Sequence, residues 1–148
     1  MRMILLLTVI ATGNCAEPAF GTWRVNTNRS TFGGGGAPRS LTVRIDPHSS
    51  GAVFTLERVG KDGRATTSST IVYFDNTPRD FQDFDCAGAQ SSRRLDGRTI
   101  EIRRNCGGSN SIWLVRRQTD KSTGLIIDFS EERRPGPNLD WRLVLEKQ

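Results

Sequence analysis

The sequence predicts an all-β protein, an antiparallel up-and-down meander that closes into a barrel of about eight strands. Short runs rich in β-branched and aromatic residues recur along the chain, and no stretch after the N-terminal apolar run has sustained helical periodicity. Asp62-Gly63 and Asp96-Gly97 lie between such runs and predict tight hairpin turns. Because a meander leaves two exposed edges, closure into a barrel is the arrangement that removes them.

Nine runs are predicted to be strands, because polar and apolar side chains alternate along several of them. Leu41, Val43 and Ile45 share one face of a strand, while Thr42 and Arg44 share the other. The runs comprise residues 21–26, 40–46, 52–59, 65–75, 90–95, 99–104, 111–118, 125–131 and 141–147. One face of the sheet is therefore expected to be buried and the other wet.

The N-terminus predicts a signal peptide. A positive charge at Arg2 precedes an apolar run that is too short to span a bilayer as a permanent helix, and Glu17-Pro18 ends it abruptly. We expect residues 1–16 to be removed and residues 17–148 to form one β-barrel domain that is secreted or periplasmic. Cleavage after Gly13 or Cys15 is the alternative.

The rest of the chain bounds the properties of the mature domain. A lipid anchor on Cys15 is disfavoured by Asn14, where a lipoprotein signal prefers a smaller residue. Without Arg2 the net charge is about +4, a mild basic excess that permits contact with anionic surfaces without requiring it. A monomer without transmembrane segments is expected.

Cys86 and Cys106 are predicted to form a disulfide, since export places both thiols in an oxidising compartment. They flank the Asp96-Gly97 turn almost symmetrically. A three-residue loop with Gly97 in the left-handed conformation pairs Arg94 with Arg98, and that register brings the two cysteines face to face. A strict two-residue turn would shift them by one position, and two buried free thiols are the competing interpretation.

Several segments resemble a family of secreted lipocalin-like proteins that is common in acidobacteria. The segment 20–26, FGTWRVN, is followed by Arg29-Ser30 and Phe32, and the similarity continues thinly to the segment 93–101, RRLDGRTIE. The family has no established activity. The resemblance therefore implies a lipocalin-like (calycin-type) barrel and export rather than a function.

The pair Gly21 and Trp23 also resembles the start of lipocalins and related barrels. In those proteins the tryptophan closes one end of the barrel, and a basic residue from the last strand packs over it. The resemblance implies that Trp23 closes the barrel here, with Arg142 as the basic residue and Lys147 as the alternative.

The sequence offers little for catalysis, a metal or a cofactor. The single histidine, His48, lies in the predicted turn Pro47-His48-Ser49-Ser50. A lone histidine in a turn is interpreted as a solvated loop residue and not as a base held against a nucleophile, so we expect no enzyme. Asp80, Asp83 and Asp85 supply oxygen ligands of the kind that calcium prefers, but they lack the spacing of an EF-hand loop, and we interpret them as an acidic surface loop. No cofactor and no metal are predicted.

Four arginine doublets (Arg93-Arg94, Arg103-Arg104, Arg116-Arg117 and Arg133-Arg134) stand out. Neighbours on a strand point to opposite faces, so one arginine of each doublet would face the interior or sit at the rim. A solvated rim is one interpretation. In the other, Arg94 and Arg104 meet an anionic head group such as a carboxylate, with Trp113 beside them. Nucleic acid is not expected as a partner, because the aromatic residues mostly have core parity.

Two functions remain open at this point. One is an exported lipocalin-like binding protein for a small apolar ligand, anionic if the inward-arginine interpretation holds. The other is a non-enzymatic envelope or protein-interaction module whose core is filled by Trp23, Trp113 and Trp141. A cavity of a few hundred cubic ångströms with apolar walls would favour the binding protein.

Overall fold

The computed structural model describes residues 19–83, 86–118 and 124–148, which form eleven strands and no helix. The predicted signal peptide, Cys15 and Asp85 lie outside these ranges. The strands are β1 (Gly21–Val25), β2 (Thr31–Phe32), β3 (Ser40–His48), β4 (Gly51–Val59), β5 (Ala65–Tyr73), β6 (Arg79–Asp83), β7 (Cys86–Asp96), β8 (Thr99–Cys106), β9 (Ser109–Arg117), β10 (Leu125–Glu131) and β11 (Leu139–Lys147). No described segment is a helix long and apolar enough to cross a membrane.

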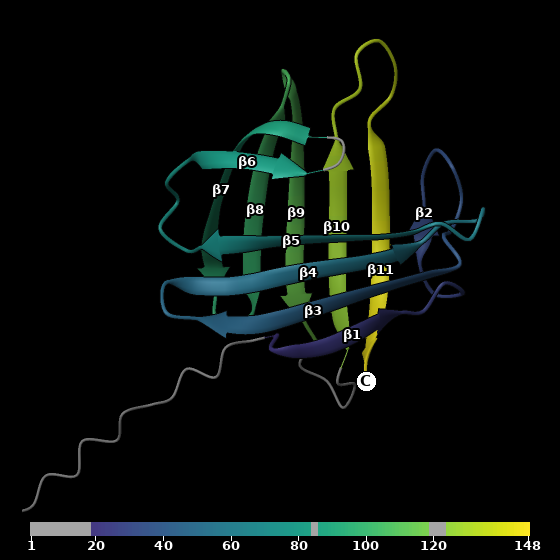
Figure 1. Ribbon diagram of the computed structural model, residues 1–148, viewed down its shortest axis with the longest axis horizontal. Coiled ribbons are helices and arrows are strands. Elements are labelled where there is room, and N and C mark those ends of the chain that lie inside the picture. Colours follow the sequence, from purple (N-terminus) through teal and green to yellow (C-terminus); the bar gives the residue numbers. More distant parts are fainter. Residues whose placement is uncertain (1–18, 84–85, 119–123) are drawn as a thin grey trace, which may run out of the picture.

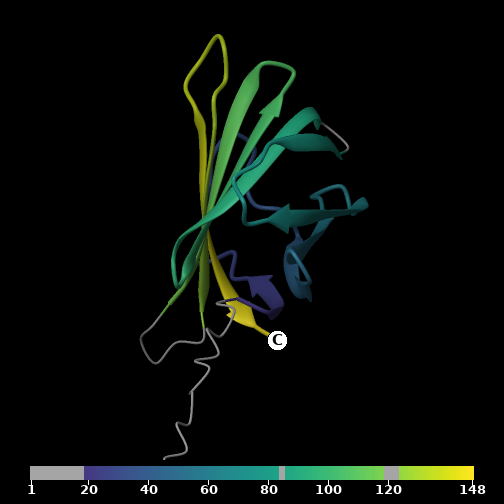
Figure 2. The ribbon, with the colours of Figure 1, turned by 90° about the vertical axis from the view of Figure 1, so that its left-hand side faces the viewer.

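All strands belong to one antiparallel sheet with the order β5-β4-β3-β1-β11-β10-β9-β8-β7-β6, and β2 pairs with β11. The sheet folds over on itself, so that β3, β4 and β5 cross in front of β7 to β11 (Figure 1). Strand β1 pairs with both β3 and β11 and joins the two layers. Seen from the side, the β8–β9 and β10–β11 hairpins extend beyond the other layer (Figure 2).

The predicted meander and near-closed barrel are confirmed, but the number of strands was underestimated. The main path has ten strands where about eight were expected. The largest omission is β6, a segment that we interpret from the sequence as part of an acidic surface loop. Phe81 is the single apolar side chain in RDFQD, so this segment has little strand pattern of its own. Phe81 is buried and faces inward, and all five residues pair with β7.

One end of the barrel is closed by packed apolar side chains. Its fully buried residues include Val43, Ile45, Val72, Leu125, Ile127 and Leu145. Trp23 is also buried there, and its indole Nε1 donates a hydrogen bond to the Ala19 carbonyl at 2.8 Å. Trp23 therefore occupies the closed end.

The basic residue over Trp23 is Lys147 and not Arg142. Lys147 is the register partner of Trp23 in the β1–β11 pair, and its Nζ lies 5.7 Å from the ring centroid. Arg142 projects from the opposite face of β11, where its guanidinium binds the Asp128 carboxylate at 3.2 Å. Residues 142 and 147 differ by an odd number, so their side chains lie on opposite faces of the strand.

The Cys86–Cys106 disulfide is present, with a Cα–Cα distance of 4.9 Å, but the predicted register is wrong. Cys106 pairs with Gly88 and Arg94 with Ile100, because the turn has two residues and is preceded by a bulge at Leu95. Gly97 is not in the left-handed region. The error is two residues, which preserves the face of each side chain, so the cysteines are diagonal neighbours on one face.

The outer arginines of two doublets are neutralised on the barrel wall. Arg93 and Arg103 flank Glu101, with Nε–Oε1 distances of 2.9 and 2.8 Å. The Glu101 side chain is only 8% exposed. Hydrogen bonds from Arg103 and Arg93 lower the pKa of this carboxyl group, although its burial acts in the opposite direction. These arginines therefore hold the wall together and do not line the interior.

Candidate functional site

The end of the barrel opposite Trp23 contains a cavity of about 570 Å³. Its apolar walls come from both layers and include Leu41, Leu56, Trp113, Phe129, Trp141 and Leu143. Glycines 33–36 form part of the mouth, where the Trp141 Nε1 donates to the Gly33 carbonyl at 2.8 Å. Two of the three tryptophans therefore line a cavity and do not fill it.

Arg104 is the central polar group of this cavity. It projects inward from β8, where its neighbours Ile102 and Ile100 are buried on the same face. Its Cζ lies 4.3 Å from the Phe81 ring centroid and 5.4 Å from that of Trp113, which are distances of cation–π contacts. The guanidinium is therefore stacked between two aromatic rings.

Burial lowers the pKa of Arg104 to about 10, because removing the cation from water disfavours its charged form. The Asp83 carboxylate opposes this shift through its charge. Asp83 also lines the cavity and accepts a hydrogen bond from the Ser68 hydroxyl at 2.7 Å. Arg104 remains a cation at neutral pH, placed in a partly apolar environment where charge interactions are strong.

The structure brings Arg104 and Trp113 together as predicted site residues, but it places Arg94 elsewhere. Arg94 pairs with Ile100 and Arg104 with Gln90, so the two arginines lie four positions apart along the β7–β8 ladder. The Arg94 Cζ lies 4.5 Å from the Phe74 ring centroid. Arg94 is not among the residues that line the cavity.

Sequence reasoning missed Gln90, Phe81 and Asp83 as part of this site. Gln90 is 7% exposed, and its Oε1 accepts a hydrogen bond from Arg104 Nε at 2.9 Å. Phe81 and Asp83 alternate inward along β6, and this period of two in a short acidic segment was the available signal.

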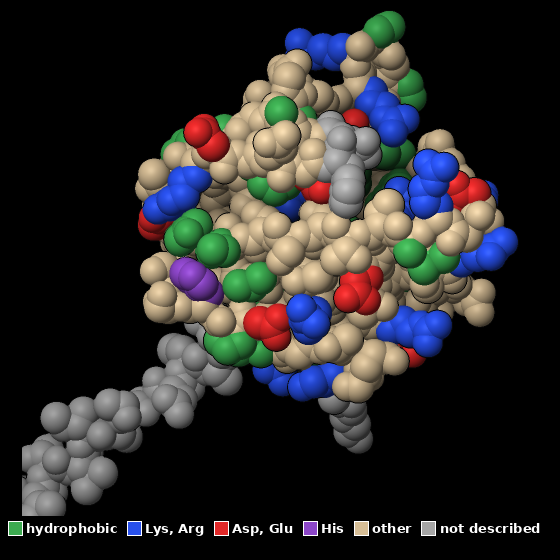
Figure 3. Space-filling view, viewed as in Figure 1, with side chains coloured by type: hydrophobic (Ala, Val, Ile, Leu, Met, Phe, Trp, Pro, Cys, Tyr) green, Lys and Arg blue, Asp and Glu red, His purple; other side chains and the backbone are tan. Residues whose placement is uncertain are grey.

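A second hollow of about 420 Å³ lies where the two ends of the sheet, β5 and β6, approach each other (Figure 3). It is lined by residues from both faces of the wall, including Thr70, Ile71, Phe81, Gln82, Gln90 and Ser91. We call this gap the seam.

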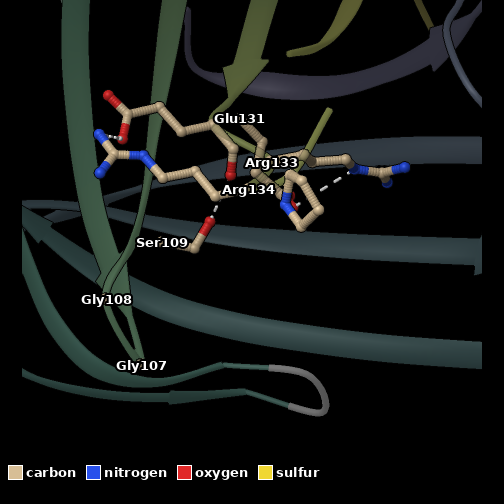
Figure 4. A pocket seen from close by; sticks show the side chains of 8 residues that line it. Gly107, Gly108, Ser109, Glu131, Arg133 and Arg134 are labelled. Carbon is tan, nitrogen blue, oxygen red and sulfur yellow. Dashed lines mark hydrogen bonds and ion pairs between the residues drawn. The ribbon is translucent and has the colours of Figure 1, made fainter. Parts of the chain in front are cut away.

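A third pocket, also of about 420 Å³, lies at the rim between the β8–β9 and β10–β11 hairpins (Figure 4). The guanidinium groups of Arg133 and Arg134 point in opposite directions there. Arg133 Nε lies 3.8 Å from Glu131 Oε1, and Arg134 Nη2 lies 3.7 Å from Glu132 Oε2. This doublet is a solvated rim in which each arginine has an acidic neighbour.

The remaining candidates from the sequence lie apart from the cavity lining. His48 ends β3, where its Nδ1 accepts a hydrogen bond from the Ser50 amide at 3.1 Å. Asp80 lies in β6 and lines the seam. Within the described ranges, no group of three or more His, Cys, Asp or Glu side chains is arranged to hold a metal ion.

The fold is similar to that of solved binding barrels. The crystal structure of the fluorescent protein UnaG superposes with a TM-score of 0.59 at 11% identity, covering 87% of this chain and 96% of that chain. A fatty acid binding protein from Schistosoma mansoni, in complex with arachidonic acid, gives a TM-score of 0.55 at 8% identity, covering 92% and 99%. At these identities the likeness establishes a calycin-type barrel fold and nothing further. No protein-family model matches the chain, and no curated protein matches its sequence.

Proposed function

We propose that this chain is a binding protein for a small amphipathic ligand, with an apolar body in the cavity and an anionic head group, such as a carboxylate, at Arg104. The observation that carries the proposal is the position of Arg104, a cation stacked on Phe81 and Trp113 inside a cavity of about 570 Å³. Cavities of a few hundred cubic ångströms, with apolar walls and few polar groups, are typical of small-molecule sites.

The head group is inferred from the balance of charge and desolvation. A buried guanidinium is stabilised by a carboxylate that accepts charge-assisted hydrogen bonds, and the planar group can donate two of them at once. Arg104 gives one donor, Nε, to Gln90. Its Nη groups provide the geometry that a carboxylate requires.

The similarity in fold to a barrel solved with arachidonic acid supports an acyl or comparable apolar body for the ligand. The apolar walls around Leu41, Leu56 and Trp141 suit such a body. We propose binding without catalysis, since His48, the single histidine, lies outside the cavity lining.

We also propose that the protein is exported after cleavage of residues 1–16. The apolar N-terminal run and the Cys86–Cys106 disulfide support this proposal, because structural disulfides persist mainly outside the reducing cytosol. Intact mass of the protein recovered outside the cytosol should correspond to residues 17–148 with two fewer hydrogens. A mass that retains residues 1–16 would contradict export by this route.

The ligand proposal is tested with a fluorescent polyunsaturated fatty acid and its methyl ester, which share the acyl chain while the ester lacks the head-group charge. We expect the wild type to bind the acid more tightly, and Arg104→Met to weaken acid binding roughly ten- to hundredfold while leaving ester binding nearly unchanged. The fold-change corresponds to the loss of charge-assisted hydrogen bonds.

The matched control is Arg103→Met, which removes the other arginine of the same doublet from the outer wall. It should leave the preference for the acid intact. An equal loss of acid affinity in both variants would assign the weaker binding to overall charge. A wild type that binds neither probe would refute this class of ligand.

A further inference from the structure

The barrel is closed by side chains at the seam, because β5 and β6 are the two ends of the hydrogen-bonded strand order. Three side chains donate hydrogen bonds across the seam. From β5, the Ser68 hydroxyl donates to Asp83 of β6. From β7, the Gln90 amide donates to the Ile71 carbonyl of β5, and the Ser92 hydroxyl donates to the Tyr73 carbonyl of β5. An isolated backbone bridge pairs Asp75 with Arg93 at one end of this row. The seam therefore depends on a few polar side chains.

Gln90 lines the seam and also bonds to Arg104, which lines the cavity. Its Nε2 lies 3.2 Å from both the Thr70 hydroxyl and the Ile71 carbonyl of β5, while its Oε1 lies 2.9 Å from Arg104 Nε. Arginine can only donate and a carbonyl can only accept, so these partners determine the orientation of the amide. Both ends of one buried amide group are therefore engaged.

Phe81 forms a second connection between the two sites. Its ring lines the seam and lies beneath the Arg104 guanidinium. Arg104 itself lines the cavity. Any movement of Arg104 toward or away from a ligand consequently acts on two residues that border the seam.

We propose that Gln90 is a positioning residue that couples ligand binding to closure of the barrel: it holds Arg104 toward the ligand head group and, through the same amide, ties β7 to β5 across the seam. This inference rests on the proposed binding of an anionic head group at Arg104. A carboxylate that immobilises Arg104 also immobilises Gln90, so the ligand tightens the seam. Conversely, a loosened seam weakens head-group recognition.

The experiment measures amide hydrogen–deuterium exchange of the β5 peptide, residues 65–73, in the exported full-length domain without ligand. Gln90→Met should raise the β5 exchange rate about fivefold, because its bonds across the seam are lost. Arg104→Met should raise it about two- to threefold, although the hydrogen bond from Arg104 Nε goes to Gln90 of β7 and reaches β5 only through that amide. In the Gln90→Met background, adding Arg104→Met should raise the β5 exchange rate by less than half as much as Arg104→Met does in the wild type.

Ser92→Ala is the matched control, because Ser92 is a buried seam donor that contacts Tyr73 and not Arg104. It should accelerate β5 exchange, and Arg104→Met should retain its full effect in that background. Equal effects of Arg104→Met in the wild-type and Gln90→Met backgrounds would overturn the coupling. So would the absence of any effect of Arg104→Met on β5.

A second arm adds the fatty acid and its methyl ester. The acid should slow β5 exchange in the wild type and in Ser92→Ala but not in Gln90→Met, and the ester should have a smaller effect. Gln90→Glu gives an independent variant: it keeps an acceptor for Arg104 but loses the donor to Ile71, and should exchange as fast as Gln90→Met. If the wild type bound neither probe, the proposed function would fail, while the ligand-free cycle would still decide the coupling.

Discussion

The two ends of the barrel differ in the side chains that their strands point inward. On β11 and β10 the closed end contributes Leu145 and Leu125, each with no exposed surface. On β7 and β8 the open end contributes Gln90 and Arg104, which bond to each other. Alternation along a strand decides which side chains face inward, while their chemistry decides whether that part of the interior is packed or can receive a ligand.

The packing that stabilises the fold and the cavity proposed to bind a ligand therefore lie at different ends of the barrel axis. Close packing at the closed end stabilises the fold through apolar burial. The open end keeps about 570 Å³ unfilled and replaces packing with a disulfide and polar bridges. Substitutions at equivalent inward positions should therefore have unequal costs at the two ends.

The largest expected effect is at the closed end. Leu145→Ala should reduce the free energy of unfolding by about 3 kcal/mol or more, because it opens a void in a fully packed region. Leu56→Ala, at a partly buried position that lines the cavity, should cost only about 1 kcal/mol. Urea unfolding of both variants measures the difference. Equal losses would mean that the two ends are equally packed.

The next effect concerns the disulfide at the open end. The double variant Cys86→Ser/Cys106→Ser should lose about 2–3 kcal/mol of stability, since the bond restricts the unfolded chain over a sequence separation of 20 residues. Reduction of the wild type with a thiol reagent should give a similar loss of urea resistance. A double variant as stable as the wild type would show that the open end does not depend on this bond.

The smallest effect concerns Glu101 on the outer wall. Its pKa is below the ordinary value of 4.5, so the folded state holds the charged form more tightly than the unfolded state does. Its contribution is fully present above about pH 4.5 and is lost as the pH falls through the lower folded pKa. Glu101→Gln should therefore cost about 1 kcal/mol at pH 7 and progressively less below pH 4.5.

The pH dependence is followed by urea unfolding of both proteins between neutral and acidic pH. Asp75→Asn serves as a comparison, because Asp75 also has a lowered pKa, caused mainly by its hydrogen bond to Arg79 on the exposed surface. A constant difference between wild type and Glu101→Gln at every pH would contradict the assignment to the Glu101 charge.

Local alternation was enough to predict most strands and the inward side of Arg104. Runs such as Leu41, Val43 and Ile45 carry their own pattern, and adjacent residues 103 and 104 must point to opposite faces. The resemblance to lipocalins implied that Trp23 closes one end of the barrel; Trp23 is buried there, and the basic residue over it is Lys147.

The features that the sequence did not predict depend on pairing between distant segments. β6 has a single apolar residue, and its strand conformation accompanies five pairs with β7. Parity placed both Arg94 and Arg104 inward but could not give their heights, which the bulge at Leu95 and the register determine. The role of Gln90 depends on β5, about twenty residues away, and a lone glutamine carries no sequence signal for it.

The distribution of tryptophans gives the molecule its own optical reporter for each end. Trp113 and Trp141 line the cavity, whereas Trp23 is buried beside Ala19 at the closed end and is only 2% exposed. A ligand in the cavity would change the immediate surroundings of the first pair and leave those of Trp23 comparatively unchanged. Denaturation would instead shift the emission of all three indoles to longer wavelength, so that intrinsic fluorescence distinguishes occupancy from unfolding without an added label.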